Sequence, residues 1–193
     1  IRNLAVGQGV QWQAVGGGVV AAVNALEVDS AGRLIVGGAF DTAGGEDASY
    51  VAVWSGGAWS TLGAGLPAEV TALASDRRGR VYAVTTAVNM TGGIEYQVWM
   101  WSGSLWIEIR STSFRVFDIA VGHDGAVYIG GTFPGGVSRW SGGPWSSVGS
   151  GFDSTVNALA VDSDGYVYAA GPFTKAGDTT LNHIARWDGA SWK

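Results

Sequence analysis

Five acidic side chains stand in the polar segments that connect the apolar runs of this sequence, and they are the best placed to do chemistry. They are Asp41, Glu46, Asp47, Glu95 and Asp178. Carboxylate oxygens bind hard cations, and two carboxylates at a defined separation cleave glycosidic bonds. Asp41, Glu46 and Asp47 could together hold a cation, but they lack the D-x-D-x-D-G spacing of a calcium-binding loop. We therefore predict that the five acids are solvent-exposed candidate binding-loop residues and that they form no metal site.

The other residue types that commonly do covalent chemistry form no recognisable set. Histidine occurs at His123 and His183, outside the spacing of a metal site or a catalytic triad, and the chain has no cysteine. No G-x-S-x-G segment is present to hold a nucleophilic serine. The Gly-rich segments at 7–12, 37–38 and 130–131 are not followed by a helix that would bind phosphate. The sequence therefore predicts no catalytic residue and no cofactor.

Charge and hydropathy exclude two kinds of partner. The 193 residues carry a formal net charge of −5, and the densest basic group is Arg77, Arg78 and Arg80, beside Asp76. The basic patch expected of a nucleic-acid-binding protein is therefore missing. No stretch approaches the roughly 18 consecutive apolar residues of a membrane-spanning helix. The chain begins at Ile1 without a signal peptide, which indicates a processed chain or a fragment.

One apolar motif returns four times along the chain and defines a repeat. It reads VNAL, VTAL, VFDI and again VNAL, beginning at residues 23, 70, 116 and 156. A short turn follows each copy, and then comes a second apolar run, at 33–40, 80–88, 126–133 and 166–173. A third run ends on a tryptophan, from which the hexapeptides WSGGAW, WSGSLW, WSGGPW and WDGASW lead into a fourth run. Each repeat thus contains four runs, which we term A, B, C and D.

The runs are expected to be β-strands. They are short, rich in Val, Ile, Tyr and Trp, and separated by Gly and Asp turns that leave no room for helices. The 32 glycines of the chain are consistent with many tight turns. Asp29, Asp76 and Asp162 open the turns from A to B, where a carboxylate can accept backbone N–H groups. We interpret these three acids as turn formers rather than as ligands.

The repeat length and the pattern of the runs predict the fold class. Four-stranded antiparallel units of about 40 to 47 residues are typical of a β-propeller. The A and B runs are apolar on both faces, as expected for blades that pack between neighbouring blades. We therefore predict an all-β fold, a β-propeller of four-stranded antiparallel blades with four full repeats plus an N-terminal half repeat. We expect a single domain over 1–193, with the half repeat at 1–19 and the repeats at 20–66, 67–113, 114–152 and 153–193.

Two stretches carry a family resemblance, VNALEVDSAGRLIVGGAFDTAGG (23–45) and VNALAVDSDGYVYAAGPFTKAGD (156–178). With the segments 50–66 and 183–192 they resemble the repeats of bacterial extracellular proteins that have kelch-like, or galactose-oxidase-central-domain-like, β-propeller repeats. The resemblance covers nearly the whole chain. It implies secretion or display at the cell surface, and it implies no shared catalytic motif. The region 93–114 departs from the family pattern, because it lacks the Leu-Gly-x-Gly end of the D run.

The chain begins with C and D runs that have no A or B before them. NLAVGQGVQW (3–12) aligns with YVAVWSGGAW (50–59), with Gly7 in the place of the first Trp, and the last D run stops at Lys193. Three arrangements remain open: the first hairpin is half of a fifth blade, the chain is part of a longer array, or another copy supplies the missing strands. Unpaired strand edges are templates for association. We therefore predict that the protein binds other copies of itself, or another protein, through its open strand edges.

The hexapeptides carry eight of the ten tryptophans, in pairs that flank a turn. The pairs are Trp54 and Trp59, Trp101 and Trp106, Trp140 and Trp145, and Trp187 and Trp192. Because each pair lies on neighbouring strands, its two rings share one face of the sheet. Such aromatic pairs contribute roughly 0.5–1.5 kcal/mol beyond the burial of area. We interpret them as structural pairs that close the outer half of each blade, rather than as a platform for a ligand.

These observations predict a function without catalysis. We expect a non-enzymatic, extracellular or cell-surface β-propeller that acts as a scaffold for binding or assembly. The alternative is a carbohydrate-binding, lectin-like propeller, since sugars stack on exposed aromatic rings. A third hypothesis is a glycoside hydrolase or lyase that uses the loop carboxylates.

Overall fold

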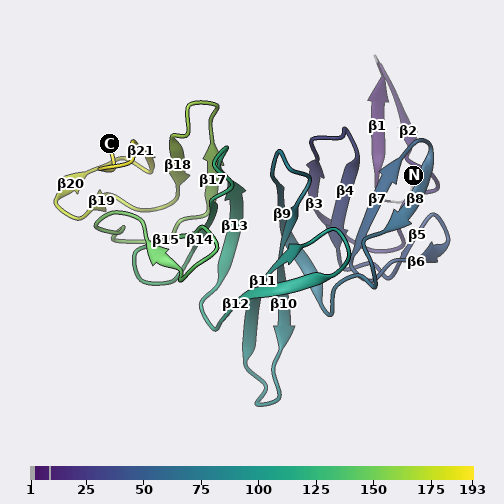
Figure 1. Cartoon of the computed structure of the whole chain (residues 1–193), viewed down its shortest axis with the longest axis horizontal. Coiled ribbons are helices and arrows are strands. Elements are labelled where there is room, and N and C mark those ends of the chain that lie inside the picture. Colours follow the sequence, from purple (N-terminus) through teal and green to yellow (C-terminus); the bar gives the residue numbers. More distant parts are fainter. Residues whose placement is uncertain (1–2, 9) are drawn as a thin grey trace. The chain divides into compact units, whose positions relative to one another are not determined.

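The computed structural model describes residues 3–8 and 10–193, and over this part of the chain it contains strands and turns but no helix (Figure 1). The predicted all-β fold is thereby confirmed. No helix among the described residues could span a membrane. The chain divides into two compact units, residues 1–111 and 112–193, each of which is described by itself.

Unit 1 contains two four-stranded antiparallel sheets whose strands lie side by side in chain order, from A to D. The first sheet consists of β3 (Val23–Val28), β4 (Leu34–Gly38), β7 (Val51–Ser55) and β8 (Ala58–Thr61). The second consists of β9 (Glu69–Ser75), β10 (Val81–Val88), β11 (Ile94–Trp101) and β12 (Trp106–Thr112). A separate two-stranded hairpin, β1 (Ala5–Gln8) and β2 (Gln11–Ala14), precedes both sheets.

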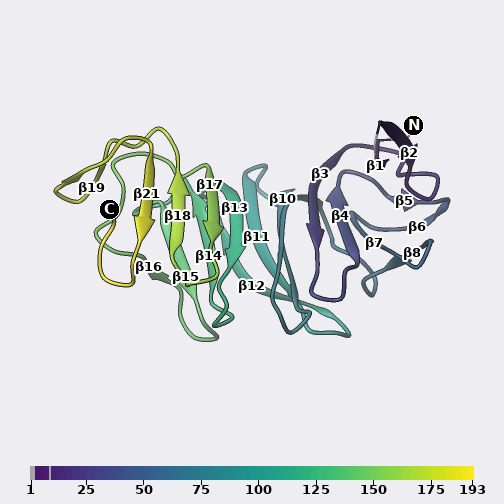
Figure 2. The ribbon, with the colours of Figure 1, turned by 90° about the horizontal axis from the view of Figure 1, so that it is seen from above.

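Unit 2 follows the same plan. Its first sheet consists of β13 (Val116–Val121), β14 (Val127–Gly131), β15 (Val137–Trp140) and β16 (Ser146–Ser147). The second sheet contains β17 (Ala158–Val161), β18 (Val167–Ala170) and β21 (Ile184–Trp187), which lie side by side in Figure 2. A bridge between Trp187 and Trp192 places the last residues at the D position of this sheet. The predicted four-stranded antiparallel blades are confirmed, whereas the single domain and its repeat boundaries stay predictions.

The core of each unit lies between its sheets. In unit 1, Ile35 and Val53 of the first sheet pack with Leu73 and Val81 of the second. In unit 2, side chains of β14 and β15 pack with those of β17 and β18 in the same way. This packing explains why the A and B runs are apolar on the face that meets the neighbouring sheet of the same unit.

The turns from A to B are held by buried aspartates, as predicted. The Asp29 carboxylate accepts the backbone N–H groups of Ala31 and Arg33, each at 2.9 Å, and pairs with the Arg33 guanidinium at 2.6 Å. Asp76 accepts the N–H groups of Arg78 and Arg80 in the same geometry. Gly32 closes the first turn with a φ of +74°, which an L side chain rarely adopts. These acids are therefore committed to the scaffold.

Asp29 gives the scaffold a defined pH dependence. Burial by itself would raise the pKa of Asp29. The pKa is nevertheless lowered below its usual value, because the carboxylate accepts hydrogen bonds from the Arg33 side chain and from the N–H groups of Arg33 and Ala31, and because the Arg33 charge lies beside it. A lowered folded-state pKa contributes stability that is present above the unfolded-state pKa and is lost as the pH falls through the folded-state pKa.

We expect Asp29→Ala to lower the free energy of unfolding by roughly 2 kcal/mol at neutral pH, because two buried N–H groups and a guanidinium lose their acceptor. The difference from wild type should shrink as the pH falls through the lowered pKa of Asp29. Urea unfolding at neutral and at strongly acidic pH measures both values. Asp164→Ala, at an exposed turn position, is the matched control and should leave the unfolding free energy unchanged. A loss for Asp29→Ala that stays constant down to acidic pH would contradict this assignment.

Candidate functional site

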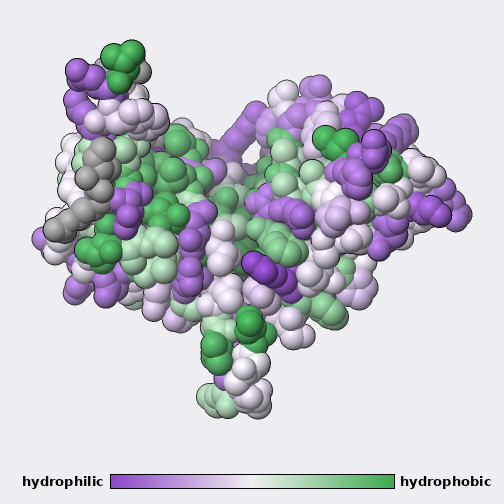
Figure 3. Space-filling model, turned by 180° about the vertical axis from the view of Figure 1, so that it is seen from behind, coloured by the Kyte–Doolittle hydropathy of each residue, from purple (hydrophilic) through white to green (hydrophobic). Residues whose placement is uncertain are grey.

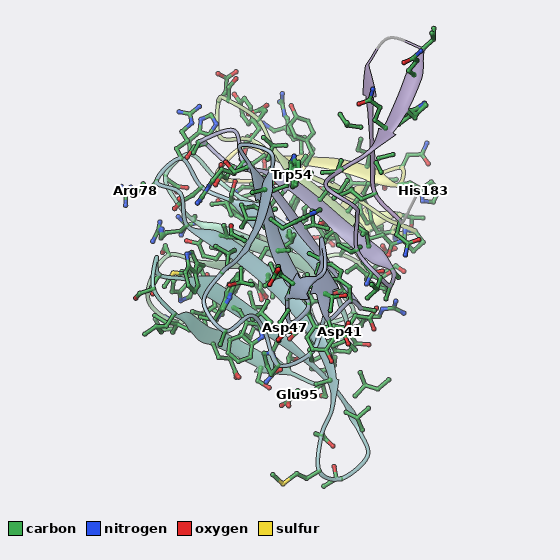
Figure 4. All side chains as sticks on the ribbon, turned by 90° about the vertical axis from the view of Figure 1, so that its right-hand side faces the viewer. Asp41, Asp47, Trp54, Arg78, Glu95 and His183 are labelled. Carbon is green, nitrogen blue, oxygen red and sulfur yellow. The ribbon has the colours of Figure 1, made fainter. Side chains whose placement is uncertain are left out.

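The three acids of the first repeat lie at one small hairpin, formed by β5 (Thr42–Ala43) and β6 (Glu46–Asp47). Figure 4 shows Asp41 and Asp47 at this hairpin. Glu46 and Asp47 are consecutive on β6, so their side chains point to opposite faces of the hairpin. Among the described residues, no group of three or more acids and histidines is arranged to hold a metal ion. The structure therefore does not bring Asp41, Glu46 and Asp47 together as one set of ligands.

The pocket beside Glu46 and Asp47 is too small for a sugar. Ala43, Trp59 and Thr61 also line it, and its volume is about 20 Å³. A cavity of this size holds roughly one water molecule. This pocket therefore has no room for a substrate ring beside Glu46 and Asp47.

The remaining two acids lie on other elements. Glu95 was predicted in the connecting segment 89–95, but it lies on β11, opposite Ala87 of β10, and it accepts a hydrogen bond from the Ser111 hydroxyl. The connection is shorter than predicted because β10 and β11 continue as one long hairpin. Asp178 is exposed in the tight turn between β19 (Lys175–Ala176) and β20 (Thr179–Thr180), in unit 2.

The connections from B to C in the first and fourth repeats are a shared part of the scaffold rather than variable loops. Both follow the pattern F-x-x-A-G, at residues 40–44 and 173–177, and both fold into a small hairpin. Each hairpin forms a bridge with the end of the preceding D run, Val19 with Ala43 and Phe152 with Ala176. Sequence reasoning treated these segments as polar connections that could carry binding residues, and it missed this common pattern.

His183 has a structural explanation. It begins a C strand with a φ of +66°, and Asn3 and Tyr50 occupy the same position of their repeats with φ values of +53° and +65°. The His183 N–H donates to the Phe173 carbonyl, just as the Tyr50 N–H donates to the Phe40 carbonyl. The position is thus a left-handed backbone turn into the C strand, and this requirement accounts for His183 without any chemistry of its imidazole.

Three of the four tryptophan pairs adopt one geometry. In the pairs Trp54–Trp59, Trp101–Trp106 and Trp187–Trp192 the ring centroids are 5.2–5.5 Å apart and the rings are inclined by 53–57°. We term each such cross-strand pair a Trp clasp. The turn inside the clasp varies from Gly-Gly to Asp-Gly-Ala-Ser, while the pair itself keeps its geometry. The pair is therefore the conserved feature of the hexapeptide.

Each of these Trp clasps rests on the D run of the preceding repeat. The indole N–H of Trp59 donates to the Gly16 carbonyl at 2.8 Å, that of Trp106 to Leu62 at 3.0 Å, and that of Trp192 to Val148 at 3.0 Å. The D runs end in Leu-Gly-x-Gly or Val-Gly-x-Gly, and the first glycine of this ending, which we term the socket glycine, lies under the rings. The socket glycines are Gly16, Gly63 and Gly149. A Cβ at Gly63 would lie 2.9 Å from the Trp101 ring, so a side chain at this position would displace the clasp.

The fourth pair differs where the socket glycine is missing from the sequence. The rings of Trp140 and Trp145 are 6.3 Å apart and inclined by only 26°. The preceding repeat carries Arg110 at the position of the socket glycine, within the region that departs from the Leu-Gly-x-Gly pattern. The change in ring geometry thus coincides with the loss of the glycine.

The N-terminal hairpin is a half-blade. Gly7 of β1 lies opposite Trp12 of β2, as Trp54 lies opposite Trp59 in the first complete sheet. The Trp12 ring lies over Gly7, 3.4 Å from where a Cβ would be, and Trp12 remains 69% exposed. The half-blade therefore contains only one of the two rings that would form a Trp clasp.

An open apolar face lies next to this half-blade, on β3. Leu26 is 54% exposed and Val28 is 64% exposed, whereas Leu73, at the position of Leu26 in the next A strand, is only 8% exposed. A groove of about 420 Å³ lies between β3 and the half-blade, and Leu4, Ala5, Trp12 and residues 23–26 contribute to its lining. Sequence reasoning did not name Leu26 and Val28, although their place beside the missing A and B runs was the available signal.

The fold resembles solved β-propellers. No protein-family model and no curated protein matches the chain. One similar structure is the β-propeller domain of the Trilobed protease from Pyrococcus furiosus, which is described as having an open velcro topology. The TM-score is 0.57 and the sequence identity is 17%. The match covers 83% of this chain and 48% of that chain. The virginiamycin B lyase from Staphylococcus aureus is similar with a TM-score of 0.45 and 13% identity, over 89% of this chain and 68% of that one.

The similarity to the protease propeller defines the class of the fold. The chain is a β-propeller protein, because it contains four-stranded antiparallel sheets and is similar in fold to the propeller domain of the protease. It spans about half the length of that protease chain. At 17% identity the likeness establishes the fold and extends to no activity.

The socket glycine can be tested by adding one methyl group. We expect Gly63→Ala to lower the free energy of unfolding by roughly 2–4 kcal/mol, because the Cβ meets the Trp101 ring at a strained positive φ. Gly79→Ala is the matched control, since Gly79 has a φ of +79° and no atom within 4 Å of the added Cβ. The free energy of unfolding of this control should fall by only roughly 1 kcal/mol, which is the cost of the backbone conformation alone. Urea unfolding followed by tryptophan fluorescence measures both variants, and equal losses would contradict the role of Gly63 as a socket.

Proposed function

We propose that the protein is a non-enzymatic β-propeller that acts as a scaffold for protein binding and assembly, through its incomplete N-terminal blade. The observation that carries this proposal is the exposure of Leu26 and Val28 beside the unpaired edge of β1. The other A strand of unit 1, β9, has the corresponding face buried in a core, which contains its Val70 and Leu73. An apolar sheet face next to an open strand edge is the arrangement used in recognition by strand addition.

The placement of the acids supports a function without catalysis. Glu46 and Asp47 border a space for about one water, and the Glu95 carboxylate accepts the Ser111 hydroxyl across two strands. The aspartates of the A–B turns are occupied by backbone N–H groups and arginines. These carboxylates are accounted for by the scaffold or by solvent.

The location follows from the repeats. We propose an extracellular or cell-surface protein with kelch-like repeats, because the stretches 23–45 and 156–178 resemble those of exported bacterial proteins. Fractionation of the source cells, with the protein detected outside the cytoplasm, is the expected result. Detection in the cytoplasm alone would contradict this location.

Association through the open face can be tested with two substitutions. We expect the mass of the wild-type protein, measured by light scattering, to rise with concentration. The double variant Leu26→Lys with Val28→Lys should instead have the mass of one chain. Lysine on an exposed sheet surface opposes edge-to-edge association without burying a charge. The circular dichroism spectrum should stay unchanged, because both side chains are exposed.

The matched control for this pair is Val88→Lys with Met90→Lys, at the tip of the β10–β11 hairpin. This tip also carries exposed hydrophobic residues, as Figure 3 shows. It lies away from the half-blade, so this control should associate as wild type does. A wild-type chain that keeps the mass of one chain at all concentrations would contradict assembly, and an equal effect of both double variants would contradict the assignment to β3.

Carbohydrate binding is the second candidate, and one groove favours it. Trp99, Leu105 and Trp106 line a groove of about 550 Å³ together with residues 64–67. This volume is within the range of roughly 300–1,000 Å³ typical of small-molecule sites. The indole N–H groups of Trp99 and Trp106 are bound to Thr85 and Leu62, so both rings are held in fixed positions. A sugar could stack its apolar C–H face on such a fixed ring.

For this candidate we expect oligosaccharides to change the tryptophan fluorescence of the wild type, and Trp99→Leu to remove the change. Trp12→Leu, at an exposed tryptophan outside the groove, is the control and should retain it. A silent glycan array together with unchanged fluorescence would contradict carbohydrate binding.

A further inference from the structure

We propose that the N-terminal half-blade is a receptor for a two-stranded β-hairpin of the A–B type, supplied by a polypeptide segment outside residues 1–193. This inference rests on the proposed binding function and names the chemistry of the partner. Its basis is that the half-blade lacks the A and B strands that would cover the exposed face of β3 in the next sheet.

The half-blade occupies the C and D positions of a blade. Asn3 starts it with the same left-handed backbone that Tyr50 has at the start of β7. The N–H of Val15 donates to the Leu4 carbonyl, which continues the pairing of β1 with β2. Val15 and Val19 then pack on Val36 and Phe40 of the first complete sheet, and Val19 bridges to Ala43. The outer half of that sheet is thus covered as it would be by a complete neighbouring blade.

The inner half of the same sheet lacks its cover. In each complete sheet of unit 1 the C strand pairs with a B strand on one edge and with a D strand on the other, as β7 does with β4 and β8. Among the described residues β1 pairs with β2 alone. The unpaired edge of β1 and the exposed face of β3 border the groove of about 420 Å³. One antiparallel pair of strands would cover this edge and this face, because its B strand would pair with β1 and its A strand would pack on β3.

The chain itself shows what covers such a face. On the next sheet, the face formed by Val70 and Leu73 of β9 is covered by Ala25 of β3 and Ile35 of β4. Asn24 adds polar contacts there, since its side-chain amide donates to the Val70 carbonyl at 2.9 Å and to Glu69 at 2.8 Å. The expected occupant is therefore a hairpin with a small apolar residue on its A strand, a large one on its B strand, and the V-N-A-L type of sequence.

A second folded copy of this chain has no such hairpin to give. Its A–B pairs are β3–β4, β9–β10, β13–β14 and β17–β18. Each of them is already paired with the C strand of its own sheet, β7, β11, β15 or β21. Donation by a copy would require one of these sheets to open. The occupant of the groove therefore comes from outside these residues, and contact between copies is a weaker association of exposed faces.

The test appends an A–B hairpin to the half-blade. Residues 153–182 end at the position before His183, which corresponds to Asn3, so a second copy of 153–182 is joined directly to Asn3 of the full chain. Tethering gives the hairpin an effective concentration in roughly the millimolar range, which an isolated two-stranded hairpin needs because it is marginally stable in water. The control carries Ala158→Asp in the appended copy alone, at the residue that corresponds to Ala25.

We expect the fusion to raise the Tm by at least about 4 °C, to slow hydrogen exchange at Ala5 and Gly7, whose N–H groups point to the open edge of β1, by at least about tenfold, and to shift the Trp12 fluorescence to the blue. It should also abolish the concentration-dependent rise in mass. The Ala158→Asp control should show none of these changes. If the unfused chain associates through Leu26 and Val28 but the appended hairpin leaves β1 unprotected, the hairpin proposal is overturned and the binding function stands. If neither association nor protection occurs, both are overturned.

Discussion

The stacking of these sheets depends on one contact, in which a Trp clasp packs on the socket glycine of the preceding repeat. It joins repeats rather than strands of one sheet: the indole N–H of Trp59 is bonded to Gly16 and that of Trp192 to Val148. A single blade leaves both of its faces exposed, so each repeat needs contacts with a neighbour, and three of the four pairs make this one. The turn inside the hexapeptide can vary because this contact is made by the two rings and their socket.

The same contact explains why an incomplete blade can remain folded. The half-blade carries the socket at Gly16, so it holds the first Trp clasp and covers the outer half of the first sheet even without A and B strands. The inner half has no cover of this kind, and Leu26 and Val28 remain in solvent. The binding that we propose at this face rests on this difference, because the corresponding face of β9 is buried by the neighbouring sheet.

Much of the fold could be predicted from the sequence because its signals are local and repeated. The periodic V-x-A-L runs, the Asp-Gly turns and the tryptophan-flanked turns each fix a strand or a turn within a few residues. The register of Trp54 opposite Trp59 follows from the length of the hexapeptide. The left-handed residues Asn3, Tyr50 and His183 share no residue type, so only their backbone relates them, and sequence reasoning could not group them.

The candidate site was less accessible, because it depends on what lies beside a residue rather than on its type. Glu46 and Asp47 look like a pair of ligands in the sequence, yet the alternation of β6 separates their carboxylates. Leu26 looks like a core residue in the sequence, yet it is exposed in the structure because no sheet among the described residues covers this face of β3. Hydrogen exchange of the unmodified chain shows whether the edge of β1 is open. We predict that the amides of Ala5 and Gly7 exchange at least about 100-fold faster than that of Ala52, which faces β4 at the corresponding position of β7. Equal protection of these amides would contradict the open edge.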